Sequence, residues 1–167
     1  MVEQFTTAAE AVGAEVKRFP TLNEAVAAIR SRAGGRAVAT SALPPPVRSA
    51  LDGLDCVPAG ALHTAEIGIS FAQAGIARTG SLLLALSDPA GRSATALPPV
   101  HLVILDAATI VADLSALGGT LGALLSSPGS AYLSLITGPS RTADIERVLT
   151  IGVHGPKELH ILIVEEN

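Results

Sequence analysis

Short apolar runs alternate with amphipathic stretches along the chain, a pattern typical of strands followed by helices. The expected strands are 14–19, 36–40, 55–58, 101–105, 132–137 and 159–164, and the expected helices are 2–12, 22–33, 44–51, 112–125 and 142–150. The sequence Thr21-Leu22-Asn23-Glu24 is a capping box that opens the second helix, and Gly34-Gly35 ends it. Near-continuous apolar strands between helices predict an α/β protein whose mostly parallel sheet is covered on both faces.

Residues 66–86 depart from this alternation. β-Branched residues, the pair Thr79-Gly80 and an apolar run predict two strands joined by a tight turn, and residues 88–91 are predicted to form another turn. The longest stretch without a charged residue, 114–140, is interrupted by glycine and proline and changes from a helical to a strand-like pattern. We therefore expect a buried helix, a turn and a buried strand there, and not a membrane span.

Length and composition narrow the class of protein. The 167 residues fit one domain, and no repeat or linker divides them, so a single domain over 1–167 is expected. With 49% hydrophobic and 16% charged residues, a disordered chain is excluded. Basic residues are scattered and the net charge is −4, which argues against nucleic-acid binding. The first residues lack the basic start and apolar stretch of a signal peptide, so a cytoplasmic protein is expected.

Cysteine and histidine usage limits the chemistry further. The single cysteine, Cys56, excludes an internal disulfide and any cysteine-ligated cluster held by this chain alone. No spacing of His, Cys and carboxylates is typical of a zinc site, so no metal is expected. Phosphate-binding loops and dinucleotide fingerprints are also missing from the sequence.

Residues 137–146, TGPSRTADIE, form the first candidate site. Gly138 permits a sharp turn after the strand, and Ser140 or Thr142 can cap the following helix. The free N–H groups of that helix end and the Arg141 guanidinium would together bind an anion. A capped helix without a ligand explains the hydroxyls and acids equally well, but it explains Arg141 less well.

Two further segments also lie at the ends of predicted strands, and in open α/β sheets ligands bind beyond the carboxyl ends of strands. In the loop 151–157, Gly152 and Gly155 flank His154, which could donate to an oxyanion or carry a proton; a helix end followed by a turn is the alternative. In the third segment, Thr79, Gly80 and Ser81 could hold a phosphate or carboxylate, with His101 nearby. A hairpin turn and a core histidine are the alternatives there.

The candidate ligand-binding residues are thus Thr79, Gly80, Ser81, Gly138, Ser140, Arg141, Thr142, Gly152, His154 and Gly155, and the candidate catalytic residues are His101 and His154.

The string TGPSRTADIERVLTIGVHGPKELHILIVE (137–165) resembles the C-terminal signature of the LUD domain, and more narrowly the lactate-utilization protein C (LutC/YkgG) family. The strings EIGISFAQAGIARTGSLLL and LPPVHLVIL agree with that family in order and spacing. The resemblance implies a three-layer α/β/α fold similar to the NagB/RpiA/CoA-transferase-like group. It also implies a role in oxidising L-lactate to pyruvate beside partner proteins that carry iron–sulfur clusters. Arg78 stands where the family usually has an acidic residue.

Three functions remain open at this point. The first is an accessory protein or subunit of lactate utilization, with no cofactor of its own, that binds a small anionic metabolite and iron–sulfur partner proteins. The second is a stand-alone enzyme on a phosphorylated or carboxylated metabolite, by analogy with 5-formyltetrahydrofolate cyclo-ligase and the sugar-phosphate isomerases. The third is a scaffold whose loops are ordinary caps and turns. The apolar composition is compatible with self-association.

Overall fold

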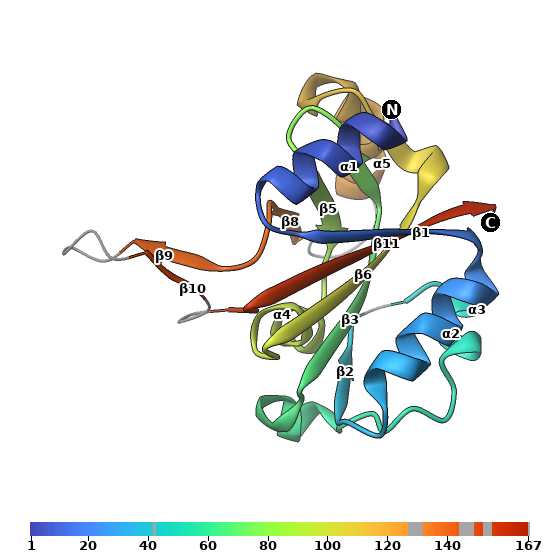
Figure 1. Cartoon of the computed structure of the whole chain (residues 1–167), viewed down its shortest axis with the longest axis vertical. Coiled ribbons are helices and arrows are strands. Elements are labelled where there is room, and N and C mark those ends of the chain that lie inside the picture. The colour runs from blue at the N-terminus through green and yellow to red at the C-terminus, as the bar shows by residue number, and fades with distance from the viewer. Residues whose placement is uncertain (42, 127–131, 144–148, 152–154, 167) are drawn as a thin grey trace.

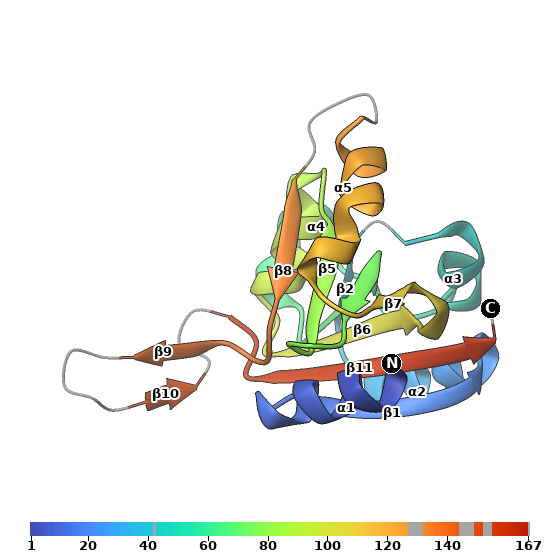
Figure 2. The same cartoon turned by 90° about the horizontal axis from the view of Figure 1, so that it is seen from above.

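The computed structural model describes residues 1–41, 43–126, 132–143, 149–151 and 155–166, with 142–143 and 149–151 described by their backbone only. Two sheets form its centre (Figures 1 and 2). The larger sheet has five parallel strands in the order β1-β11-β6-β3-β2. These strands are β1 (Glu15–Thr21), β2 (Val38–Thr40), β3 (Ile67–Ala72), β6 (Val100–Asp106) and β11 (Glu158–Glu166). The prediction of a mostly parallel central sheet is confirmed.

A smaller sheet lies against the first, with the order β7-β4-β5-β8. Its strands are β4 (Ala74–Ile76), β5 (Ser81–Ala85), β7 (Ile110–Val111) and β8 (Leu133–Ile136). Residues 66–86 therefore hold three strands, where the sequence predicted two. The chain leaves the larger sheet after Ala72, and the N–H of Gln73 already bonds to the carbonyl of Leu83 in the smaller one. The tight turn at Thr79-Gly80 lies between β4 and β5 as predicted.

The described residues also form five α-helices. They are α1 (Val2–Ala11), α2 (Leu22–Ala33), α3 (Pro45–Ala50), α4 (Pro89–Ala96) and α5 (Gly118–Leu125), with 3₁₀ turns at 59–64, 107–109 and 114–117. The capping box is confirmed, because Thr21 Oγ1 accepts from the Glu24 N–H at 3.3 Å and Gly34 ends α2 in the left-handed conformation. The predicted turn at 88–91 is wrong. Asp88 instead caps α4, accepting from the Gly91 N–H at 2.7 Å, and Pro89 takes the first helical position.

The two faces of the parallel sheet are covered differently. On one face, α2 and α3 bury a core that includes Ile29, Ile69 and Leu102. On the other face, α1 and the smaller sheet enclose a second core around Phe5 and Leu82, while α4 packs across β3 and β2. The outer layer of this second face is thus part helix and part sheet (Figure 2).

The helix predicted over 142–150 is wrong at the residues that the structure describes. Strands β9 (Arg141–Ala143) and β10 (Leu149–Ile151) pair in antiparallel fashion and extend away from the two sheets (Figures 1 and 2). The Ser140 N–H donates to the Pro156 carbonyl at 2.9 Å, which joins the residue before β9 to the segment that leads into β11. Helix-capping signals report only on neighbouring residues, so they could not predict a hydrogen bond between Ser140 and Pro156.

The expected burial of 114–140 is also wrong in part. Helix α5 has no fully buried residue, and Leu125 at its end is 62% exposed. Leu117, just before α5, is fully buried against the smaller sheet, α5 itself adds the partly buried Leu121 and Leu124, and β8 is half-buried. None of the helices in the described part of the chain is long and apolar enough to cross a membrane.

Replacing Gly80 by alanine should lower the free energy of unfolding by about 2 kcal/mol or more. Gly80 has a φ of +65°, and an added Cβ would lie 2.3 Å from the backbone nitrogen of Ala9 in α1. Gly119→Ala is the matched control, since a Cβ there meets no atom within 4 Å and should stabilise α5 by about 0.5–1 kcal/mol. Urea unfolding of both variants measures the difference, and equal effects would contradict this account of Gly80.

Candidate functional site

A cleft of about 490 Å³ lies between α4, β8 and the segment that leaves β8. His101 and Leu159, the second residues of β6 and β11, contribute to its wall. The cleft therefore opens at the amino ends of these two central strands, whereas the sequence analysis placed ligand sites beyond the carboxyl ends of strands. Residues 137–141 do follow the carboxyl end of a strand, but that strand is β8 of the smaller sheet.

Five of the sequence candidates line this cleft. They are His101, Gly138, Ser140, Arg141 and Gly155. Among the described lining residues, the charged ones are Arg92 and Arg141, and none is Asp or Glu. The cleft thus combines positive charge with hydroxyl groups, a composition suited to an anion.

Sequence reasoning missed Arg92. Its guanidinium carbon lies 4.9 Å from the centre of the Tyr132 ring, a cation–π contact that joins α4 to the start of β8. The Leu86 N–H also donates to the Tyr132 carbonyl at 2.8 Å, which fixes the tyrosine beside β5. The sequence did hold a signal for Arg92. Asp88 followed by Pro89 is a typical helix start, and a helix beginning there places Arg92 close to its first turn.

Arg141 contacts the end of α1. Its Nη2 donates to the carbonyl of Val12 at 2.7 Å, so the charge sits at the negative end of the helix dipole. Gly138 packs on the same carbonyl, since a Cβ there would lie 2.5 Å from the Val12 oxygen. The predicted anion site at a helix N-terminus is therefore wrong, because Arg141 begins a strand. The guanidinium nevertheless lines the cleft.

Thr79 and Ser81 reach the cleft indirectly. Thr79 Oγ1 and Ser81 Oγ lie 2.7 Å apart, and Ser81 Oγ lies 2.7 Å from Thr137 Oγ1, which lines the cleft. Gly80 packs against α1. Residues 79–81 thus form a hairpin turn, as the alternative interpretation predicted. A chain of three hydroxyl groups, on Thr79, Ser81 and Thr137, links this turn to the cleft. The side chain of Thr142 and all of Gly152 and His154 lie outside the described residues.

His101 is a buried residue at the cleft wall, 2% exposed. Its Nε2 lies 2.8 Å from Oγ of the fully buried Ser70, and Nδ1 has no partner among the described residues. Burial lowers the pKa of His101 to about 4, so the ring is neutral at pH 7. If Ser70 donates to Nε2, the ring proton resides on Nδ1, which then offers a donor to a ligand.

The described residues contain no cluster of three or more His, Cys, Asp or Glu able to hold a metal ion. Cys56 lies at the surface. Loss of some of its hydration and the negative charge of the nearby Asp55 raise the pKa of its thiol. A reactive thiolate is therefore disfavoured at this position.

The LUD domain model matches residues 61–164, 104 of the 167 residues. The chain belongs to the LUD domain family. Arg92, His101, Ser140, Arg141 and Gly155 all fall within the matched range. The resemblance carried by residues 137–165 is thereby confirmed.

Several curated proteins are similar to part of the chain. An uncharacterized protein of Neisseria meningitidis is 39% identical over 59% of this chain and 42% of its own length. A lactate utilization protein C of Macrococcus caseolyticus is 33% identical, and YkgG of Escherichia coli is 35% identical, each over 61% of this chain and 45% of its own length. The chain therefore spans less than half the length of these relatives.

A solved structure shares the fold. A DUF162 family protein from Deinococcus radiodurans superposes with a TM-score of 0.67, over 98% of this chain and 95% of that one, at 19% identity. The agreement extends to the region before residue 61, which the family model does not match.

Acid should destabilise the protein through His101. The unfolded histidine takes up a proton below about pH 6.5 and the folded one only near pH 4, so stability should fall across that window, by roughly 3 kcal/mol in total. The His101→Gln variant should lose this slope. Glu15 and Glu158, whose pKa values are lowered, contribute only below about pH 4.5 and do so in both proteins. Urea midpoints from pH 7 to 4.5 test this, and parallel slopes would contradict it.

Proposed function

We propose that the cleft binds a small anionic metabolite. The observation that carries the proposal is the lining itself: two arginines and several hydroxyls, with no carboxylate among the described lining residues. In a partly enclosed space, each charge-assisted hydrogen bond to an arginine contributes about 1.5–3 kcal/mol.

The contacts around the two arginines suit them for this task. Tyr132 holds Arg92 over its ring, and Val12 takes one nitrogen of Arg141. Each guanidinium carries five N–H donors, so donors remain for a ligand carboxylate. A neutral His101 with its proton on Nδ1 would add an uncharged donor that does not vary with pH near neutrality.

We further propose that the protein serves L-lactate utilization, as an accessory protein or subunit in the cytoplasm. Relatives named lactate utilization protein C support this role. One cysteine falls short of the four thiolates of an ordinary iron–sulfur cluster, so the clusters would belong to partner proteins. The carboxylate of lactate or pyruvate would then be the anion in the cleft.

Arg92→Gln should weaken the binding of L-lactate and pyruvate about tenfold or more, because it removes a charge-assisted bond while keeping a side chain of similar length. Arg48→Gln is the matched control, on the exposed face of α3 away from the cleft. Isothermal titration calorimetry on the three proteins measures the effect. Equal affinities in wild type and Arg92→Gln, or no binding by wild type, would overturn the assignment of the cleft.

The role in lactate utilization is tested separately. Anaerobic affinity capture of the tagged chain from its own host, grown on lactate, should recover proteins with iron–sulfur absorbance that bleaches on adding lactate. Host cells grown without lactate provide the control. A colourless, partner-free eluate under both conditions would contradict the accessory role and leave anion binding by the cleft intact.

A further inference from the structure

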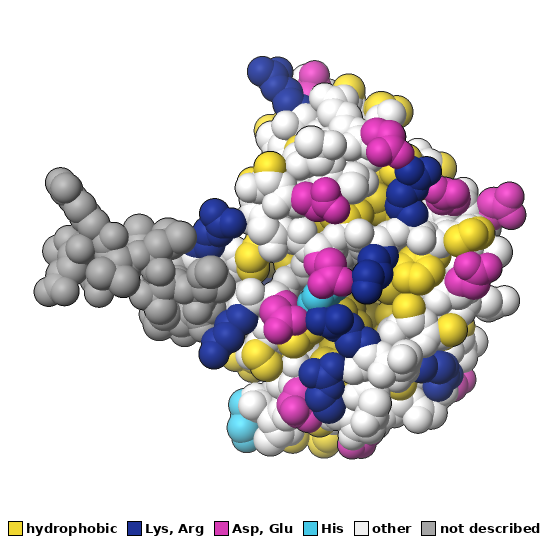
Figure 3. All heavy atoms as spheres, viewed as in Figure 1, with side chains coloured by type: hydrophobic (Ala, Val, Ile, Leu, Met, Phe, Trp, Pro, Cys, Tyr) yellow, Lys and Arg dark blue, Asp and Glu magenta, His cyan; other side chains and the backbone are white. Residues whose placement is uncertain are grey.

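We propose that a second cavity, on the opposite face of the parallel sheet, binds a carboxylate with an apolar body, such as a medium-chain or aromatic acid. This cavity, the α2 pocket, has a volume of about 330 Å³ and lies where α2 crosses β1 and β11 (Figure 3). It is lined by Glu15, Lys17, Phe19, Ala28, Ile29, Ser31, Arg32, Leu102, His160, Ile161 and Leu162.

The alternation of side chains along strands separates this pocket from the cleft. In the register of β6 and β11, Leu159 pairs with His101 and His160 pairs with Leu102. His101 and His160 therefore point to opposite faces of the sheet. His101 lines the cleft and His160 lines the α2 pocket. The two cavities are thus independent sites.

The floor of the α2 pocket is apolar. Ile29, Leu102 and Leu162 are buried members of the core under α2, and Phe19 packs against the same core. With Ala28 they give the pocket five apolar side chains, which suit a hydrocarbon chain or a ring. Ile161 also lines the pocket, but its side chain packs in the core on the other face of the sheet. A volume of about 330 Å³ is at the small end of the range for ligand pockets.

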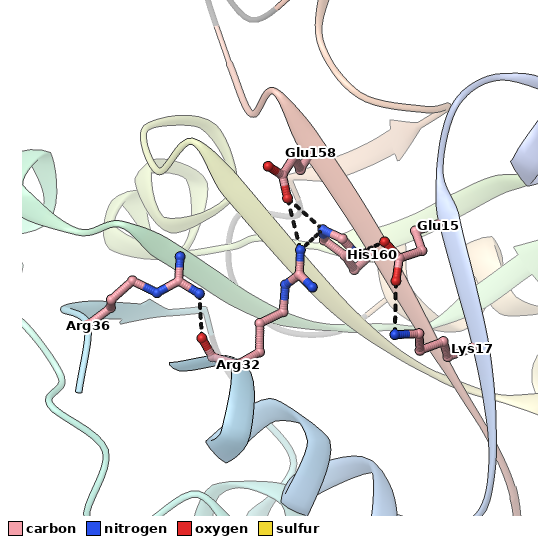
Figure 4. Close-up of polar contacts among 6 residues, drawn as sticks. All are labelled: Glu15, Lys17, Arg32, Arg36, Glu158 and His160. Carbon is pink, nitrogen blue, oxygen red and sulfur yellow. Dashed lines mark hydrogen bonds and ion pairs between the residues drawn. The ribbon is translucent and has the colours of Figure 1, made fainter. Parts of the chain in front are cut away.

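The polar side chains of the rim are linked by hydrogen bonds and ion pairs (Figure 4). Glu15 is the acidic residue of the lining, and both of its oxygens are engaged: Oε1 with Lys17 at 3.0 Å and Oε2 with His160 Nδ1 at 3.2 Å. Its carboxylate is therefore poorly placed to attract a cationic ligand.

The two cations of the rim keep donors for a ligand. Lys17 is 63% exposed and holds its single ion pair at the surface, where such pairs contribute little. Arg32 uses Nη2 for Glu158 at 2.9 Å and for His160 Nε2 at 2.5 Å. Its other terminal nitrogen has no partner among the described residues. A ligand carboxylate can thus pair with Arg32 or with Lys17 while His160 keeps its contacts.

Most of the pocket lies outside the family match. Seven of its eleven lining residues, those on β1 and α2, precede residue 61, where the match begins. The family match therefore assigns this pocket no ligand, and the ligand is inferred from the contacts described above.

Isothermal titration calorimetry with acetate, butyrate, hexanoate and 3-phenylpropionate tests the proposal. Affinity should rise along the series, by up to about fourfold for each methylene that becomes buried. Ala28→Phe, a half-buried lining position on α2 outside the polar network, should fill the pocket and weaken hexanoate binding at least tenfold. Lys17→Gln changes an exposed side chain and should weaken hexanoate binding about threefold or more. It provides the test of the pocket if Ala28→Phe fails to fold.

Arg92→Gln is the control that separates the two sites. It should leave hexanoate binding unchanged, whatever it does to lactate binding. Hexanoate affinity no better than that of acetate would overturn the proposal. It would also be overturned by wild-type hexanoate affinity in both Ala28→Phe and Lys17→Gln, or by loss of hexanoate binding in Arg92→Gln.

Discussion

The close approach of the smaller sheet to helix α1 is the constraint on which the cleft depends. Two glycines mark it, because a Cβ at Gly80 or Gly138 would lie within 2.5 Å of the α1 backbone or of its cap residue Val12. Arg141 adds a hydrogen bond to the same carbonyl. These contacts fix the β4–β5 turn and the end of β8, and therefore one wall of the cleft. Gly80, Gly138 and Arg141 were predicted from the sequence to bind a ligand, but each of them also packs against α1 or its cap residue.

The parallel sheet imposes the second constraint, because both of its faces are buried. A polar side chain on such a face needs a partner, and Ser70 Oγ lies 2.8 Å from His101 Nε2, which leaves Nδ1 of the ring for a ligand. Burial keeps the imidazole neutral, so its contribution to a ligand is a hydrogen bond and not a charge. The charge of the cleft comes instead from arginines on α4 and after β8, at the rim where water still reaches them.

The two cavities differ in how their charges are balanced. In the cleft, Arg92 contacts an aromatic ring and Arg141 a backbone carbonyl, and within the described part of the chain neither has a carboxylate partner. In the α2 pocket, Lys17 and Arg32 each pair with a glutamate. The cleft is thus suited to a small, strongly charged anion. The α2 pocket needs apolar contact as well, because its cations are already partly screened.

The sequence by itself determined the elements that rest on local signals. The capping box at Thr21 and the left-handed Gly34 fixed α2, and continuous apolar runs identified β6 and β11. Sequence strings also identified the family. Tertiary structure decided the rest. Ser140 bonds to Pro156, and β9 pairs with β10 where the sequence offered helix-capping residues, while Arg92 meets Tyr132 across forty positions. Periodicity reports which side of an element is buried, but these contacts join distant segments, so only the packing of the two sheets brings them together.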